Sequence, residues 1–139
     1  MVGMSTLDQA MNYLADHAIN LDQWETAKNL SLTGNINCSG TRNGSFVYRL
    51  RKDHKAILIW GRMYISGYSR SGANPGVRFT VPEAGFPNSA IYCGFRGESS
   101  VEAIQINLSQ GTITTTETFS NASGSRLTFI IPNALILKN

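Results

Sequence analysis

Charged side chains are scarce in this chain of 139 residues, and the scarcity narrows the classes of protein it can be. Asp, Glu, Lys and Arg make up 15% of the residues, against about 25% in an average soluble protein. The formal net charge is +3, and the densest basic run is only Arg49-Leu50-Arg51-Lys52. Nucleic-acid binding normally needs a basic stripe with stacking aromatics or a known motif, so we expect no nucleic-acid partner. The shortage of charge also suggests that other subunits cover part of the surface.

Long apolar runs and cysteine motifs are missing as well. No segment approaches the roughly 18–20 apolar residues of a membrane span, and the N-terminus lacks the basic-then-apolar order of a signal peptide. Cys38 and Cys93 have neither a CxxC nor a metal-ligand spacing, and their redox state stays open between one disulfide and two free thiols. We therefore expect no membrane insertion, no metal and no cofactor.

Catalytic residues are equally sparse. Of the two histidines, His17 lies in a helical pattern and His54 follows Asp53 in a polar turn. No HExxH, GxSxG, P-loop or GxGxxG motif is present, and no two carboxylates stand out as the facing pair of a glycosidase. These absences predict that the chain is not an enzyme, with a polysaccharide-degrading activity as the remaining alternative.

What the sequence does contain begins with a helical pattern over residues 5–28. Ser5 and Asp8 form a capping-box-like S-x-x-D pair, and neither Gly nor Pro interrupts the segment. Apolar residues recur at steps of four and three, which is the a/d pattern of a coiled coil. They are Leu7, Met11, Leu14, Ala18 and Leu21. We expect residues 1–30 to form a neck whose helix pairs with copies of itself, with packing on its own domain as the alternative.

From residue 29 onward the chain reads as short strands and turns. The predicted strands cover residues 46–50, 56–66, 77–81, 90–95, 101–108, 112–119, 126–131 and 134–137. Turns rich in Gly, Pro and Asn separate them, and no helical pattern interrupts them. Before the first strand, Asn43-Gly44 is a hairpin-type turn signal. The predicted fold class is therefore mainly β: an antiparallel β-sandwich or barrel of jelly-roll or Greek-key type over residues 31–139, preceded by one N-terminal α-helix.

The predicted strand 56–66 is apolar on both of its faces. Ile57, Ile59 and Met63 alternate with a second series that contains Trp60 and Tyr64. Because successive side chains of a strand point to opposite faces, both faces must be covered. We therefore expect this strand to be central, with Trp60 and Tyr64 in a core or an interface.

Candidate binding residues lie in the predicted loops. Residues 67–76 form a long loop with three glycines and a proline, and Arg96 follows the strand 90–95. Aromatic faces stack on sugar CH groups, while Arg and Asn exchange hydrogen bonds with hydroxyls. Since binding residues concentrate on loops held by a rigid scaffold, we predict a saccharide or receptor site. Its residues are Tyr68, Arg70, Asn74 and Arg96.

Four segments resemble the head domains of bacteriophage tail-fibre and baseplate receptor-binding proteins. Residues 46–66 resemble a polar turn followed by an apolar strand ending in Gly-Arg, and residues 79–88 (FTVPEAGFPN) resemble a T-L-P-x-G-[FY]-x-P segment. Residues 101–116 resemble a later hairpin, and the closing LTFIIPNALILKN resembles a terminal strand pair. This sequence departs from the pattern at Ala84, which intervenes before Gly85, and at the hairpin turn, which lacks an acidic residue.

The resemblance implies a homotrimer at the tip of a phage tail, assembled in the host bacterial cytoplasm with other phage tail proteins. It would attach the virion to a saccharide or protein on the bacterial surface. Trp60 and Tyr64 would then join the helical seam in the interface between copies. A lectin-like carbohydrate-binding module of a bacterial enzyme and a purely structural virion protein remain the alternatives. The receptor, the host, the strand order and the extent of the whole protein do not follow from the sequence.

Overall fold

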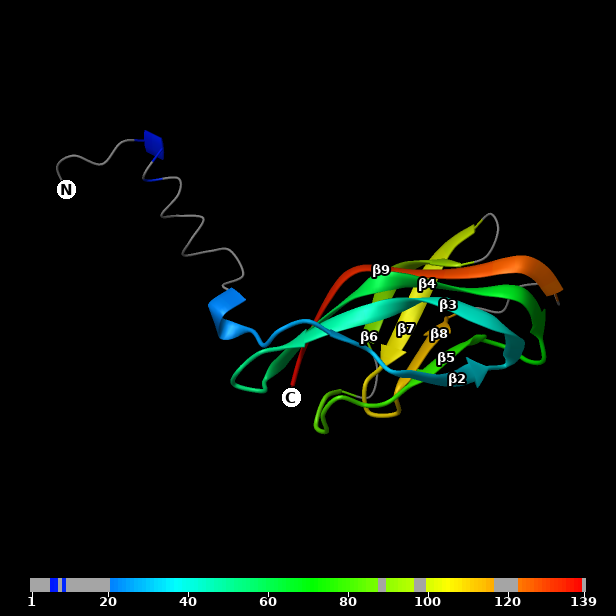
Figure 1. Ribbon diagram of the computed structural model, residues 1–139, viewed down its shortest axis with the longest axis horizontal. Helices are drawn as coiled ribbons and strands as arrows, with labels where there is room; N and C mark the ends of the chain where they lie inside the picture. The colour runs from blue at the N-terminus through cyan, green and yellow to red at the C-terminus, as the bar shows by residue number, and fades with distance from the viewer. Residues whose placement is uncertain are drawn as a thin grey trace.

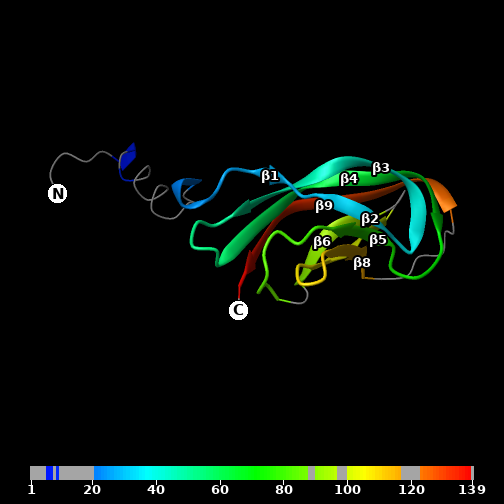
Figure 2. The same cartoon turned by 60° about the horizontal axis from the view of Figure 1, so that its bottom comes forward.

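Two antiparallel β-sheets stack face to face (Figures 1 and 2). The computed structural model describes residues 6, 7, 9, 21–87, 90–96, 100–116 and 123–138. The four-stranded sheet has the order β1 (Lys28–Asn29), β3 (Cys38–Leu50), β4 (Ala56–Arg70), β9 (Ser123–Leu137). The five-stranded sheet has the order β2 (Leu32–Ile36), β5 (Gly76–Phe79), β8 (Thr112–Thr115), β7 (Ser100–Asn107), β6 (Ala90–Arg96). The mainly β part of the prediction, with antiparallel sheets, is thus confirmed.

The core lies between the two sheets and follows from the period of two along each strand. From the four-stranded sheet, the inward series of β4 contributes Ile57, Ile59, Met63 and Ile65, all fully buried. The five-stranded sheet contributes a second series of buried side chains: Val77, Phe79, Ile104, Ile106 and Ile113. The predicted alternation in strand 56–66 is therefore confirmed for its inner face.

The chain changes sheet at two neighbouring corners. Asn37 between β2 and β3 has a φ of 53°, and Asn74 between β4 and β5 has a φ of 51°. Asn tolerates this left-handed conformation better than most residues. The Ser71 amide donates to the Asn37 carbonyl at 2.9 Å, and Asn37 Nδ2 donates to the Ala73 carbonyl. These hydrogen bonds join the two corners. The hairpin that β3 and β4 form in one sheet therefore continues as the β2–β5 pair in the other sheet.

The two ends of the sandwich differ in what they contain. We call the end with these corners and the start of β9 the distal end. The opposite, proximal end carries the 3-10 turn η1 (Leu21–Gln23), the turn of residues 51–55 and Lys138 (Figure 1). Backbone hydrogen bonds fasten the proximal end, because Glu25 N donates to Leu50 O and Lys138 N to Lys55 O, both at 2.8 Å.

Most of the predicted N-terminal helix lies outside the described residues. For the last part of this segment, the prediction of a helix is wrong. After η1, Trp24 bridges to Arg51, and Lys28–Asn29 pair as β1 with β3. Trp24 is only 7% exposed. Burial of a large indole against the sheet is worth more than the small helix propensity of these residues.

Two further predictions of chain breaks are wrong. Asn43-Gly44 lies inside β3 instead of forming a turn, and a Cβ at Gly44 would lie 2.5 Å from the Arg62 carbonyl. Glycine there permits close strand pairing. Pro132 lies inside β9, where Ile59 faces Ala134 but Gly61 faces Ile131, so β9 carries an extra residue. A proline without N–H is tolerated at such a bulge on an edge strand.

The two faces of β9 should respond oppositely to truncation. Ile136 is 3% exposed in the core, whereas its neighbour Leu135 is 48% exposed. Ile136→Ala is expected to lower the free energy of unfolding by about 2–5 kcal/mol. Leu135→Ala should change it by less than about 0.5 kcal/mol at concentrations where the chain is monomeric. Urea unfolding of both variants tests this, and equal losses would contradict the assignment of faces.

Candidate binding face

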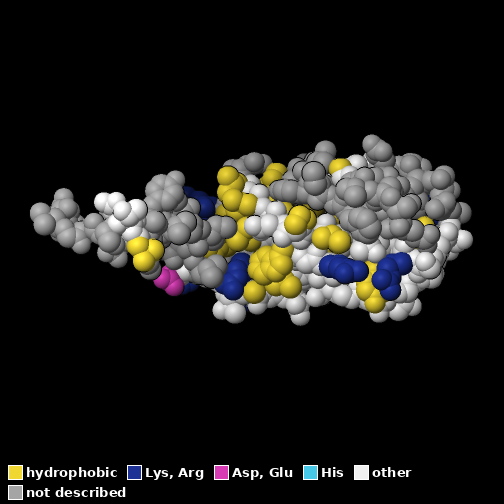
Figure 3. Space-filling model, turned by 90° about the horizontal axis from the view of Figure 1, so that it is seen from above, with side chains coloured by type: hydrophobic (Ala, Val, Ile, Leu, Met, Phe, Trp, Pro, Cys, Tyr) yellow, Lys and Arg dark blue, Asp and Glu magenta, His cyan; other side chains and the backbone are white. Residues whose placement is uncertain are grey.

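The outer face of the four-stranded sheet has an apolar centre. The register directs Leu58 and Leu135 to this face as one pair, and Val47 and Trp60 as the next. Leu135 and Leu137 are 48% and 57% exposed. Figure 3 looks onto this face and shows apolar side chains gathered beside Lys and Arg. We call the following set the outer patch: Val47, Leu58, Trp60, Ile130, Leu135 and Leu137.

The chain covers the outer patch only at its proximal edge, as far as the described residues show. Trp24 arrives from the segment after η1 and forms a small buried cluster with Ala56 and Leu58. Trp60 packs against this cluster but remains partly exposed. An antiparallel sheet usually presents its outer face to water with polar side chains, and this face instead resembles the edge of a second core.

Arginines flank the outer patch. Arg62 pairs directly with Ile130, and Arg126 places its guanidinium 4.2 Å from the centre of the Tyr64 ring. Arg49 Nη1 donates to the Glu25 carbonyl at 3.5 Å. Apolar groups together with negative charge would therefore complement this face.

The predicted binding residues lie on several elements of both sheets. Tyr68 is 2% exposed in the core, because β4 continues to Arg70 and only residues 71–75 form the loop. Its assignment to an exposed loop is wrong. Arg70 pairs with Cys38 on β3, and Asn74 makes the neighbouring corner. Arg96 ends β6 in the other sheet, paired with Ser100.

The predicted interface residues are placed only in part. Trp60 and Tyr64 both lie on the outer face, partly exposed. Leu7 is 68% exposed, and Leu21 belongs to η1. Met11, Leu14 and Ala18 lie outside the described residues. Contact between copies through these residues stays a prediction.

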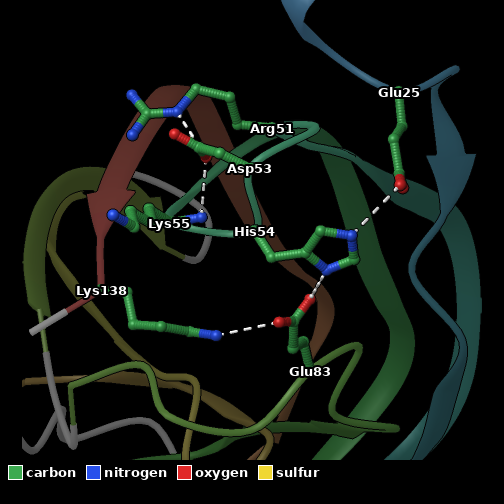
Figure 4. A network of polar contacts seen from close by, with 7 residues as sticks. All are labelled: Glu25, Arg51, Asp53, His54, Lys55, Glu83 and Lys138. Atoms are coloured by element: carbon green, nitrogen blue, oxygen red, sulfur yellow. Dashed lines mark hydrogen bonds and ion pairs between the residues drawn. The ribbon is translucent and has the colours of Figure 1, made fainter.

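A network of polar contacts ties four chain segments together at the proximal end (Figure 4). Glu83 is its centre, with Oε2 2.7 Å from His54 Nδ1 and Oε1 2.8 Å from Lys138 Nζ. His54 Nε2 lies 3.7 Å from a carboxylate oxygen of Glu25. The hydrogen bond from Lys138 and, after it, the one from His54 lower the pKa of the Glu83 carboxyl below its ordinary 4.5.

Asp53 and His54 are neighbours in the turn but have different partners. Asp53 Oδ1 accepts from Arg51 Nε at 2.8 Å and from the Lys55 amide at 2.9 Å, whereas His54 faces Glu83. Both ring nitrogens of His54 lie beside carboxylates, so the ring serves to join segments. A hollow of about 360 Å³ adjoins the Asp53 side of this turn. It is lined by Asp22, Gln23, Arg51, Lys52 and Asp53.

The described residues offer no arrangement for a bound metal. Among them, no group of three or more His, Cys, Asp and Glu side chains could hold an ion. Cys38 is a free thiol, and burial raises its pKa, so it is not an activated nucleophile. In the same part of the chain, no helix combines the length and apolar character that crossing a membrane requires.

The proximal network should make a small, acid-sensitive contribution to stability. Glu83→Gln is expected to lower the free energy of unfolding at neutral pH by less than about 1 kcal/mol, because the carboxylate is partly solvated. Since the folded-state pKa is below the ordinary 4.5, this contribution is complete above that pH and is lost as the pH falls through the folded-state pKa. Denaturant unfolding between about pH 7 and about pH 3 measures it. Glu25→Gln is the control with a smaller expected effect, and a loss independent of pH would refute the assignment.

Comparison of the chain with protein-family models, with curated proteins and with solved structures finds no match. The function is therefore inferred from the geometry above together with the resemblance of the four segments.

Proposed function

We propose that this chain is the head of a bacteriophage tail-fibre or baseplate receptor-binding protein. In this proposal it forms a homotrimer in the virion and attaches it to a saccharide or protein of the bacterial surface without catalysing a reaction. The outer patch carries the proposal, because it is an apolar sheet face that the described residues of one copy leave partly open. The resemblance of the four segments supplies the viral context.

Covering the outer patch would contribute favourable free energy to an assembly. Complete burial of a Leu side chain is worth about 1.5–3 kcal/mol, so covering the exposed halves of Leu135 and Leu137 contributes about 1 kcal/mol each. In a three-fold assembly these contributions occur in every copy. One strand, β4, then fills the core of its own copy with one face and contacts a neighbouring copy with the other.

A neighbouring copy of the same chain offers the chemistry that this face requires. Before Lys28 the sequence has no Lys or Arg but carries four acids: Asp8, Asp16, Asp22 and Glu25. The same segment contains the apolar a/d series that predicts a helical neck. Acidic and apolar groups thus complement a face of leucines flanked by Arg62 and Arg126. We also propose the jelly-roll type for the sandwich, because β2–β3 and β4–β5 cross between the sheets together.

One observation favours a lectin-like module as a second candidate. Trp60 and Tyr64 lie four residues apart on the same outer face, which places them about 13 Å from each other. Two partly exposed aromatic rings at this spacing suit the stacking of successive sugar units. In such a module the face would stay free of other copies, so the chain would be monomeric and bind sugar through Trp60.

The mass of the full chain in solution separates these functions. We expect three times the 15.2 kDa chain mass by sedimentation or light scattering. Leu135→Glu should dissociate the trimer, because it puts a charge into the covered face. Gln110→Glu adds the same charge to the exposed turn between β7 and β8 and should leave the trimer intact.

The variant Leu14→Glu, in the predicted helical seam, shows whether the neck contributes to the same assembly. A wild-type monomer would exclude the trimeric head and favour the lectin-like module. A trimer unaffected by Leu135→Glu would show that the outer patch is not the interface.

A further inference from the structure

The outer face of the four-stranded sheet changes in character towards the distal end. Its proximal part carries the leucines of the outer patch, whereas its distal part is polar and aromatic. Tyr64 lies six residues beyond Leu58 on β4, which is about 20 Å along the strand. The register directs a set of side chains to this distal part, and we call it the basic patch: Asn43, Arg62, Tyr64, Ser66 and Arg126.

The basic patch is open to solvent. The side chains of Arg62 and Arg126 are exposed, and that of Tyr64 is half-buried between them. Figure 3 looks onto this face and shows Lys and Arg side chains, but no Asp or Glu, over the part of the sandwich that the structure describes. A solute therefore reaches these side chains directly.

The two arginines of the basic patch lack the carboxylate partners that other cations of the chain have. Lys138, for example, forms an ion pair with Glu83 at 2.8 Å. Neither Arg62 nor Arg126 forms an ion pair or a hydrogen bond with any described residue. Two exposed and uncompensated positive charges on one face favour an anionic partner at that face.

Stacking on Tyr64 orients the guanidinium of Arg126. Its central carbon, Cζ, lies 4.2 Å from the centre of the Tyr64 ring. A guanidinium that stacks on an aromatic ring keeps its N–H donors free at its edges, where one carboxylate can accept two of them. Because the stacked side chain is already ordered, it loses less conformational entropy on binding an anion than a free arginine does.

Asn43 adds an oriented hydrogen-bond acceptor to the basic patch. Its Nδ2 donates to the Thr41 carbonyl at 3.1 Å and to the Ser66 hydroxyl at 3.2 Å. These bonds use both hydrogens of the amide, so Oδ1 is the group left for a ligand. Since Asn43 pairs directly with Tyr64, this acceptor lies on the same face as the arginines. A fitting ligand therefore carries hydroxyl groups as well as negative charge.

We propose that the basic patch binds an acidic saccharide whose sugar units carry carboxylates, that is, a polyuronate. Arg62 and Arg126 donate to the carboxylates, and Asn43 Oδ1 accepts from a ring hydroxyl. A neutral saccharide would leave the arginines without partners, and a polyanion without hydroxyls would leave Asn43 without one. For its biological meaning this inference rests on the proposed function, since it names the class of receptor.

The direct test titrates the full chain with trigalacturonate and two control compounds. The trimethyl ester of trigalacturonate keeps the hydroxyls and lacks the charge, whereas propane-1,2,3-tricarboxylate keeps three carboxylates and lacks hydroxyls. Ligand-observed NMR at low ionic strength, where exposed charges are screened least, should show that the uronate binds at least about fivefold more tightly than either control. Equal affinities for the uronate and either control would overturn the proposal.

Substitutions should separate the contact with the charge from the contact with the hydroxyl. Arg62→Gln and Arg126→Gln should each weaken trigalacturonate about threefold to fivefold and leave the affinity for the ester unchanged. Asn43→Ala should weaken the uronate and the ester by the same factor, because both carry the hydroxyl. Arg78→Gln is the matched control, since it removes an exposed arginine from the outer face of the other sheet and should change neither affinity.

An affinity for the uronate that survives Arg126→Gln or Asn43→Ala would overturn the site, and so would an equal loss in Arg78→Gln. Each of these variants alters a solvent-accessible side chain, so Tm is measured beside each titration to verify that the chain is folded.

The competing occupant of the basic patch is the acidic segment before Lys28 in a neighbouring copy. If that segment covers the patch, trigalacturonate does not bind and Arg126→Gln makes the trimer dissociate at a higher protein concentration. This result overturns the inference alone and leaves the trimeric head standing. If the inference holds, Arg126→Gln weakens the uronate and leaves the mass in solution unchanged. A monomer that binds the uronate overturns the trimeric head alone.

Discussion

A strand that is apolar on both faces must be covered on both faces, and β4 imposes this constraint on the whole molecule. Its inner series packs against the five-stranded sheet and supplies the centre of the core. Its outer series meets only Trp24 and the side chains of its own sheet among the described residues. The core makes the fold self-sufficient, whereas the outer patch makes a second copy energetically useful. In the proposed function, assembly would thus depend on the same strand as folding.

The outer patch and the proximal network occupy different parts of the sandwich. The outer patch runs along the outer face of the four-stranded sheet. The network around Glu83 joins separate chain segments at the proximal end. In the proposed trimer, several weak receptor sites on one assembly would gain avidity on a repetitive cell surface.

The sequence predicted the parts of the fold that depend on local alternation. The period of two in residues 56–66 correctly separated the core face from the face that bears Trp60. Prediction from alternation failed where pairing between distant strands determines the extent of a strand. Pro132 lies within β9 because a bulge on an edge strand accommodates it. Tyr68 was assigned to a loop because of the glycines around it, yet pairing with β9 extends β4 past it. Arg126 carries no local signal, since only the register shows that it shares a face with Tyr64.

The accessibility of Trp60 to a dissolved quencher tests most directly whether copies cover the outer patch. The chain has two tryptophans, and Trp24 is 7% exposed, so Trp60 accounts for most of the quenching by acrylamide. We expect the quenching constant to fall as the protein concentration rises through the range in which copies associate. Quenching that stays constant while the measured mass increases would show that the copies meet elsewhere, and it would contradict the account.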